Sequence, residues 1–315
     1  MSEKIATRQA YSEELAELGE KHPKIVVLDA DLSSSTGTAK FAKKFPERFF
    51  DMGIAEQNMI STAAGLACAG KTVFASSFAM FASGRAWEQI RNSVAHNDFN
   101  VKIAATHAGI TLGQDGASHQ AIEDIAIMSV IPKMTVLVPA DANETKAMLR
   151  ALVKHKGPCY LRLGRHPLPI IFDKDFVFEI GKAQVLKQGT DITIISIGVM
   201  TSIALEAVEM LKAKNISAEV INLSTIKPLD KETIINSLKK TKAVVVAEEH
   251  NEVCGVNQII GALISKEVDF FCPMETVAIK DRFGQSGTPD ELLEEYGLTA
   301  KDICEQVEKA LSRKK

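Results

Sequence analysis

Short runs of β-branched and other apolar residues alternate along the chain with amphipathic stretches, a pattern typical of parallel α/β architecture. In the first half, the apolar runs predict strands at residues 25–28, 72–75, 101–105, 135–138 and 159–163. In the second half, they predict strands at residues 192–197, 218–223, 243–247 and 276–279, then a helix from about Ala300. We therefore expect an α/β fold in which mostly parallel sheets are flanked by helices.

The length of 315 residues favours two domains, because one domain typically takes about 150 residues. Residues 164–189 separate the two sets of strands, and they begin with glycine and proline and then show no clear period. We expect a first domain at residues 1–168, a linker at 169–189 and a second domain at 190–315.

The composition excludes several classes of protein. With 46% apolar and 24% charged residues and a net charge of −3, the chain is not a general binder of nucleic acid or membrane surfaces. The N-terminus lacks the apolar core of a signal peptide, and no stretch is long enough to cross a bilayer, so we expect a cytoplasmic protein. The five scattered cysteines contain no C-x-x-C pair and predict reduced, mostly buried thiols.

One carboxylate falls where the pattern predicts burial. Glu56 opens a helical run in which Ile60, Ala63 and Ala67 follow on the same face. An unpaired buried carboxylate is costly and commonly holds a proton, which it can donate to a ligand nitrogen. The alternative is a first-turn glutamate that faces solvent and interacts with the helix dipole.

Two aromatic residues follow the strand predicted at residues 72–75. Phe78 and Phe81 are three positions apart, so in a helix or turn they project to the same side and can stack on a planar ring. Their place at the carboxyl end of a strand favours a ligand site, because open parallel sheets bind ligands there. The alternative is a pair of core residues.

Residues 106–120 form a polar loop after another strand. The loop holds His107, Asp115, His119 and three glycines, a combination suited to binding hydroxyls and phosphates. A metal site is the competing interpretation, and the twelve-residue separation of the histidines disfavours it. Arg8 and Arg165 have the planar fork that binds phosphate through two bonds, although each alone would normally be a solvated surface arginine.

Together these segments, and above all Gly-Ile-Ala-Glu-Gln at residues 53–57, resemble the C-terminal half of transketolase, a thiamine diphosphate enzyme. The resemblance covers essentially the whole chain. It implies that Glu56 contacts the cofactor's aminopyrimidine, that Phe78 and Phe81 surround this ring, and that Asp31 lies near the thiamine. A third aromatic residue of the family is replaced by Gly84.

The resemblance also implies a sugar-phosphate site and catalytic roles for Glu56 and His107. Asp115 corresponds to a residue near the 2-hydroxyl of the sugar. The residues implied to bind substrate are Arg8, Ser35, His107, Asp115, His119 and Arg165. The reaction implied is the transfer of a two-carbon ketol unit from a ketose phosphate to an aldose phosphate, as in the pentose phosphate pathway.

A complete transketolase is about twice as long and begins with a domain that carries Gly-Asp-Gly and a metal-binding Asn, a motif not found here. The resemblance therefore implies the C-terminal subunit of a split transketolase: a pyrimidine-binding domain followed by a transketolase C-terminal domain. Its expected partner is a separate N-terminal subunit, in a heterotetramer with two copies of each chain. That partner would hold the diphosphate and Mg²⁺ or Ca²⁺, so we expect no metal ligands in this chain.

Three alternatives remain at this point. Deoxyxylulose phosphate synthase shares residues 53–57, but its loop resembles Asp-Arg-Ala-Gly where this chain has Thr106-His107-Ala108-Gly109. The β subunit of a 2-oxoacid dehydrogenase acts on an unphosphorylated acid and would not need the basic residues. A non-catalytic scaffold or regulatory protein can retain the same fold.

Two second-domain segments have no role implied by the pattern. Residues 281–287 are similar to a motif of the family's C-terminal domain. Glu248, Glu249 and His250 follow a predicted strand, and we expect them to form a solvated cluster at its end.

Overall fold

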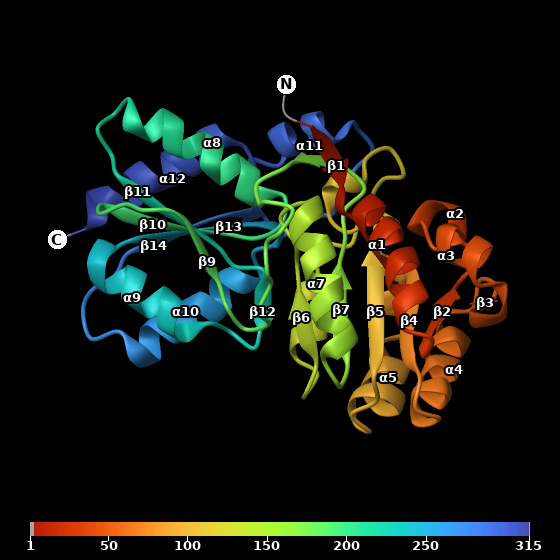
Figure 1. Ribbon diagram of the computed structural model, residues 1–315. Helices are drawn as coiled ribbons and strands as arrows, with labels where there is room; N and C mark the ends of the chain where they lie inside the picture. The colour runs from red at the N-terminus through yellow and green to blue at the C-terminus, as the bar shows by residue number, and fades with distance from the viewer. Residues whose placement is uncertain (1–2, 315) are drawn as a thin grey trace.

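Two β-sheets, one in each half of the chain, organise the computed structural model, which describes residues 3–314 (Figure 1). The first sheet has the order β12-β6-β7-β5-β4-β2-β3, and its strands are parallel except for β12. Its strands are β2 (Ile25–Asp29), β3 (Phe49–Asp51), β4 (Thr72–Phe78), β5 (Val101–Thr106), β6 (Thr135–Leu137), β7 (Cys159–Arg162) and β12 (Thr225–Lys227).

Helices cover both faces of this sheet, which explains why β2, β5 and β7 are buried along their whole length. In β2, Ile25 and Val27 pack into the core beneath α1 and α7, while Val26 and Leu28 face the opposite core with α4. The first face carries α1 (Thr7–Lys21) and α7 (Ala142–Lys154). The other carries α4 (Glu56–Cys68), α6 (Asp124–Ser129), α5 (Trp87–Gln89) and the π-helical segments η2 (Met80–Arg85) and η3 (Ile90–Ala95).

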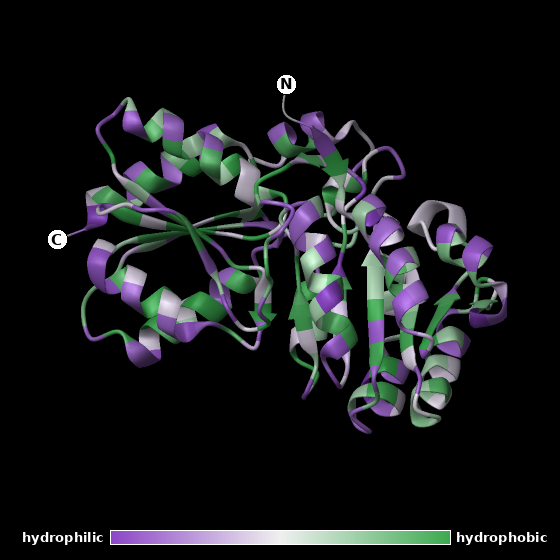
Figure 2. Cartoon of the chain, viewed as in Figure 1, coloured by the Kyte–Doolittle hydropathy of each residue, from purple (hydrophilic) through white to green (hydrophobic). Residues whose placement is uncertain are grey.

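The second sheet has the order β14-β13-β10-β11-β9, with β9 antiparallel at one edge. Its strands are β9 (Gln184–Lys187), β10 (Ile192–Ser196), β11 (Ala218–Asn222), β13 (Val244–Asn251) and β14 (Met274–Ile279). Figure 2 shows these strands as largely apolar between helices of mixed polarity. The flanking helices are α8 (Met200–Lys212) and α12 (Ala300–Arg313) on one face, and α9 (Lys231–Thr241) and α10 (Val256–Glu267) on the other.

The two halves share core and sheet contacts. One apolar cluster extends from Val136 in the first sheet to Ile195 in the second, and β12 leaves the second half of the chain to pair with β6. The remaining elements are β1 (Lys4–Ala6), paired with β8 (Pro167–Pro169), and α2 (Ser33–Thr36), α3 (Ala39–Lys44), η1 (Pro46–Arg48), η4 (Ile110–Leu112) and α11 (Pro289–Glu295).

The α/β fold class predicted from the sequence is confirmed, and each predicted strand and the helix at Ala300 are present. The strands β1, β3, β8, β9 and β12 were not predicted, because they lie at sheet edges or in the two-stranded sheet and lack a continuous apolar run. The division at residues 168 and 189 stays a prediction; β9 lies inside the predicted linker.

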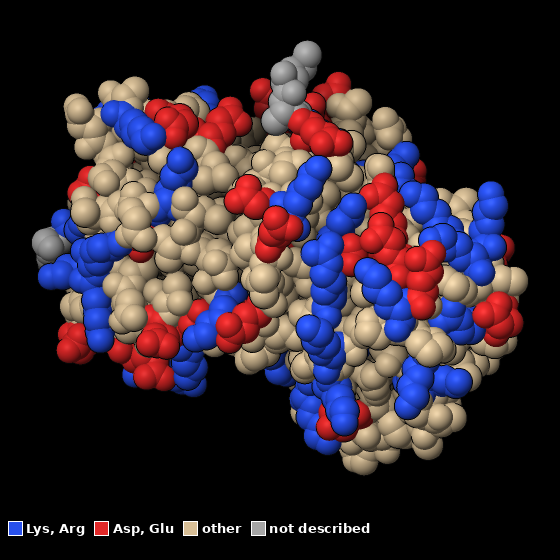
Figure 3. Space-filling view, viewed as in Figure 1, with Lys and Arg blue, Asp and Glu red and all other residues tan. Residues whose placement is uncertain are grey.

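The surface carries charged side chains in pairs, and some of the cysteines are exposed. On the face in Figure 3, basic side chains over α7 lie beside acidic ones over α1, where Lys146 pairs with Glu13 and Arg150 with Glu14. No helix within residues 3–314 is long and apolar enough to span a membrane. The expectation of mostly buried thiols is wrong for Cys68 and Cys254, which are exposed.

Candidate active site

The carboxyl ends of β2, β4, β5 and β7 meet at one edge of the first sheet, the upper edge in Figure 1. Parallel strands place the residues that follow them at this common edge, where open α/β sheets bind ligands. Asp31 follows β2, Phe78 ends β4, His107 follows β5, and Arg165 lies shortly after β7. Predicted site residues from four separate segments are therefore gathered at one edge.

Glu56 is buried, as predicted, but it is not unpaired. It begins α4 with 1% of its surface exposed, which excludes the solvent-facing alternative. Arg85 donates from Nη1 to Oε2 at 2.9 Å, whereas Ser77 donates to Oε1 over a longer 3.4 Å. Arg85 was not predicted from the sequence, because only the π-helical segment that contains Phe81 brings it back to α4. Oε1 is the carboxylate oxygen with the weaker contact.

Phe78 and Phe81 project to the same side, as their spacing predicted. Their ring planes lie within 10° of parallel, with centroids 6.1 Å apart. The His107 ring stacks on the Phe78 ring with centroids 3.9 Å apart, and the His119 ring meets the Phe81 ring edge-on with centroids 5.3 Å apart. The Arg85 guanidinium lies 4.8 Å from the centre of the Phe81 ring. The predicted cofactor residues and the predicted sugar residues thus form one aromatic cluster.

The loop after β5 presents a neutral histidine. His107 has a positive φ of 60° and is 3% exposed, and its Nδ1 lies 2.9 Å from the hydroxyl of Thr106. Burial, followed by the positive charges of Arg8 and Arg165, lowers the pKa of His107 to about 3. At neutral pH this imidazole carries no charge and can exchange hydrogen bonds with a hydroxyl group.

Two arginines form a cationic corner beside the loop. Arg8 donates to the backbone carbonyl of Ser35, and Arg165 donates to the carbonyl of Leu112 at 3.0 Å. Burial, followed by the charge of Arg165, lowers the pKa of Arg8, because the two guanidinium groups are close enough to repel each other. Oδ1 of Asp115 lies 3.6 Å from Nη1 of Arg165, and this carboxylate offsets part of the positive charge. The corner suits an anion that accepts bonds from both arginines.

Asp31 lies at the edge of this arrangement. It is exposed, has a φ of 62°, and donates its backbone N–H to Oδ1 of Asp51 at 3.1 Å. The same oxygen accepts the N–H of Gly53 at 2.9 Å, so Asp51 joins Asp31 to the segment that leads into Glu56. The sequence pattern did not predict a role for Asp51, because an aspartate before a turn is common and does not by itself indicate a site residue.

The expectation that Glu248, Glu249 and His250 are solvated is wrong. Their exposed fractions are 0%, 5% and 0%, because the first domain covers the end of β13. Glu248 caps α10 by accepting the N–H groups of Val256 and Asn257. Glu249 reaches into the first domain, and His250 accepts the N–H of Ala126 at 3.4 Å. The cluster is part of the junction between the two domains.

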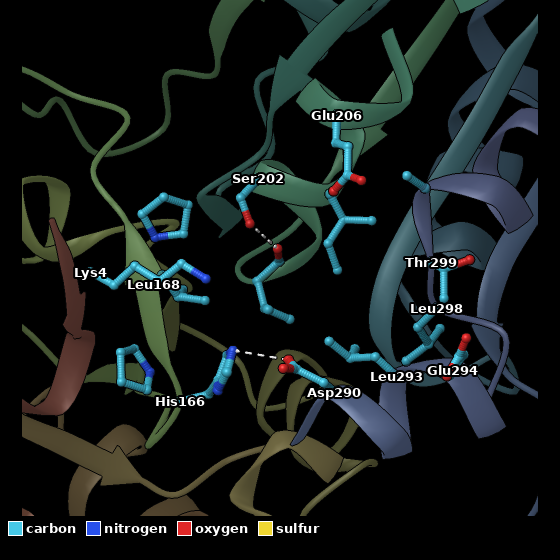
Figure 4. A pocket seen from close by; sticks show the side chains of 15 residues that line it. Lys4, His166, Leu168, Ser202, Glu206, Asp290, Leu293, Glu294, Leu298 and Thr299 are labelled. Carbon is cyan, nitrogen blue, oxygen red and sulfur yellow. Dashed lines mark hydrogen bonds and ion pairs between the residues drawn. The ribbon is translucent and has the colours of Figure 1, made fainter. Parts of the chain in front are cut away.

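A cleft of about 470 Å³ lies apart from these residues, between β8 and the helices α8 and α11 (Figure 4). In it His166 faces Asp290, with 3.8 Å between Nε2 and Oδ1. None of the predicted site residues lines this cleft. We place the candidate site at the aromatic cluster, where the carboxylate, the rings and the cationic corner meet.

Comparison with known protein families agrees with this architecture. Residues 3–170 match the pyrimidine binding domain of transketolase, and residues 181–303 match the transketolase C-terminal domain. The chain belongs to the transketolase family. Its pyrimidine-binding domain implies thiamine diphosphate as the cofactor.

Relatives of similar length are described as a section or a subunit of transketolase. The chain is 52% identical to the putative transketolase C-terminal section of Methanocaldococcus jannaschii, covering 95% of this chain and 94% of that protein. It is 39% identical to the 6-deoxy-6-sulfo-D-fructose transketolase subunit SqwH of a Clostridium species, and the match covers 98% of this chain and 95% of that protein. By contrast, it covers only 49% of transketolase-like protein 2 of Mus musculus, at 39% identity.

Solved structures show the same relation. A split gene transketolase described as an inactive beta4 tetramer superimposes with a TM-score of 0.92 at 52% identity, covering 99% of this chain and 100% of that one. The transketolase of Campylobacter jejuni gives a TM-score of 0.82 at 21% identity, with 98% of this chain matching 47% of that one, and shares the fold. The chain is therefore similar, along nearly its whole length, to a protein described as a transketolase C-terminal section.

Proposed function

We propose that this chain is the catalytic C-terminal subunit of a split transketolase, which transfers a two-carbon ketol unit between sugar phosphates together with a separate N-terminal subunit. The observation that carries the proposal is the buried Glu56, which Arg85 joins to the near-parallel rings of Phe78 and Phe81. The split transketolase relatives support the division into two chains.

The residues at this edge fit the pyrimidine end of thiamine diphosphate. A planar ring against Phe78 and Phe81 would bring a ring nitrogen toward Glu56, whose Oε1 has only the 3.4 Å contact with Ser77. Thiamine diphosphate supplies a carbon nucleophile for cleaving the bond beside a ketone. The chain's contribution is to place the Glu56 carboxyl group beside that ring nitrogen and to keep the ring oriented.

The cationic corner would bind the substrate's anionic end. Arg8 and Arg165 would hold the phosphate, and the side chains of Asp115 and His119 would contact the sugar beside it. His107 would serve as the catalytic hydrogen-bonding group at the reacting hydroxyl, where an uncharged imidazole can both donate and accept. These groups act by orientation, which lowers the entropic barrier to reaction.

The remaining half of the cofactor site would come from the partner. We assign the diphosphate and its Mg²⁺ or Ca²⁺ to the N-terminal subunit, in a heterotetramer with two copies of each chain, and place the complex in the cytoplasm. No group of three or more His, Cys, Asp or Glu within residues 3–314 is placed to hold a metal ion.

The substrate class is tested by reconstitution. The chain is copurified with its N-terminal subunit and assayed with xylulose 5-phosphate and ribose 5-phosphate, with 6-deoxy-6-sulfofructose, and with pyruvate. We expect ketol transfer with the sugar phosphates, and loss of roughly 100-fold or more in kcat with Glu56→Gln, since a proton-transfer group contributes that much. Exposed Glu47→Gln is the matched control.

Other outcomes separate the alternatives. Turnover of pyruvate without sugar-phosphate transfer would indicate a deoxyxylulose phosphate synthase or a 2-oxoacid dehydrogenase subunit. Preference for the sulfonated sugar would place the chain with SqwH, because the arginine pair can bind a sulfonate as it binds a phosphate. No turnover with any partner subunit would leave a non-catalytic scaffold and refute the proposal.

A further inference from the structure

The loop at residues 107–122, here called the substrate loop, is held along its length by the second domain. Glu249 at the end of β13 accepts the N–H of Thr111 through Oε1 at 2.7 Å. Asn251 donates its N–H to the carbonyl of Ile122 at 2.7 Å. A third contact comes from the segment before α11, where the carbonyl of Gln285 accepts a bond from Gln120 at 3.0 Å.

Glu249 fits the loop so closely that one position must be glycine. Gly109 has a φ of 78°, and a Cβ on it would lie 2.1 Å from Cδ of Glu249. The carboxylate is itself fixed from the first domain, since Oε2 lies 3.5 Å from Nη1 of Arg162. Arg162 also donates to the carbonyl of Glu249 at 3.0 Å and pairs with Asp124 at 2.9 Å. Glu249, Arg162 and Asp124 therefore form a buried network in which each charged group has a partner of opposite charge.

Gln120 makes the second close fit. It is 3% exposed, and its Nε2 donates to the carbonyls of Ile110 and Gly113 within the loop as well as to Gln285. A Cβ on Gly284 would lie 1.8 Å from Oε1 of Gln120. The motif at residues 281–287 thus packs against the substrate loop.

The loop needs such support. His107, Gly109, Gly113 and Gly116 all have positive φ, and η4 is its one regular element, a single short turn. A chain with this backbone and several glycines loses much conformational entropy when it takes one shape. External contacts are required to hold it, and the second domain supplies them at Thr111, Gln120 and Ile122.

We infer that Glu249 is a positioning residue, and that the second domain acts as a clamp that sets the substrate loop, and with it His107, Asp115 and His119, in the geometry for binding sugar phosphate. The part concerning sugar binding rests on the proposed function. Glu249 touches Thr111 and Arg162, so it acts through the loop and not on the substrate.

The test compares two adjacent buried acids on β13. Glu249→Ala removes the acceptor of the Thr111 N–H, whereas Glu248→Ala disturbs contacts made only within the second domain. In the isolated full chain, we expect hydrogen exchange in residues 107–122 to become about tenfold faster in Glu249→Ala and to change less than about twofold in Glu248→Ala. Unchanged exchange in Glu249→Ala, or equal acceleration in both variants, overturns the inference.

A second pair of variants covers the case in which Glu249→Ala does not fold. Gly284→Ala, in a partly exposed segment, displaces Gln120, while Gly261→Ala on α10 meets only Met274 at 3.4 Å. Faster exchange in the substrate loop of Gly284→Ala alone supports the clamp, and unchanged exchange contradicts it. These measurements need no partner and no turnover, so a wild-type complex without activity refutes the proposed function but still leaves the clamp tested.

In an active complex, the clamp predicts that a change at Glu249 weakens the binding of substrate more than the binding of cofactor. For Glu249→Ala the KM for the sugar phosphate should rise roughly fivefold or more, while the thiamine diphosphate concentration for half-maximal rate changes less than about twofold. Glu249→Gln keeps a carbonyl acceptor for Thr111 and should restore most of the affinity. Equal losses for substrate and cofactor, with no rescue by Gln, would show a purely structural role and overturn the inference.

Discussion

Charge and protonation at single residues decide what this edge of the sheet can do. Glu56 is buried beside a half-exposed arginine, His107 is buried in its uncharged form, and Arg8 and Arg165 share one corner. The sequence pattern predicted the burial of Glu56 and the shared side of the phenylalanines. It did not predict Arg85 as the partner of Glu56, because a contact between residues 29 apart depends on how the intervening strand and turn fold.

The state of His107 gives a prediction with a defined sign. Its pKa falls from 6.5 to about 3, so the folded chain binds fewer protons than the unfolded chain across this range. The stability that neutral His107 contributes is therefore complete above pH 6.5 and is lost as the pH falls toward 3. In ring ¹⁵N spectra assigned by His107→Gln, we expect His107 to stay uncharged at pH 5. A titration midpoint near 6.5 would contradict the assignment.

At the scale of elements, the π-helical segment η2 does the most to shape the site. It follows β4 directly and turns Phe81 over Phe78 while returning Arg85 to the first turn of α4. The sequence predicted a helix or turn here but not its wider pitch, because π-helical turns have no strong local signal and often mark functional sites. The strands were predicted better, since buried parallel strands give continuous apolar runs.

A double-mutant cycle tests this role of η2. Arg85→Met leaves Glu56 buried without its ion pair, so we expect the free energy of unfolding to fall by about 1–2 kcal/mol, with the value reduced because Arg85 is half exposed. Adding Glu56→Gln should recover part of this loss, giving a coupling energy of roughly 1 kcal/mol. The four proteins are compared by urea unfolding, and additive effects would show that the pair does not interact in solution.

At the scale of the whole molecule, the two domains are joined through buried polar contacts as well as a shared apolar core. Glu144 of α7 accepts a bond from Asn222 of β11 at 2.9 Å, and Glu249 enters the substrate loop. Local pattern correctly separated the two sets of strands. It failed for Glu248, Glu249 and His250 because only the docking of one domain on the other buries that strand end.

Glu144 makes this junction sensitive to alkaline pH. Burial raises its pKa from 4.5 to about 8, so the folded chain holds a proton that the unfolded chain has lost. The stability it contributes is complete below pH 4.5 and is lost as the pH rises through about 8. We expect the free energy of unfolding to decline more steeply between pH 6 and 9 in the wild type than in Glu144→Gln. Parallel pH profiles would contradict this origin.

The central claim is that this chain supplies the pyrimidine half of a thiamine diphosphate site that a second chain completes. Calorimetric titration of thiamine diphosphate with Mg²⁺ into this chain, into the N-terminal subunit, and into an equimolar mixture tests it most directly. We predict that the mixture binds the cofactor at least about tenfold more tightly than either chain, a difference of roughly 1.4 kcal/mol or more. Binding by this chain alone as tight as by the mixture would contradict the claim.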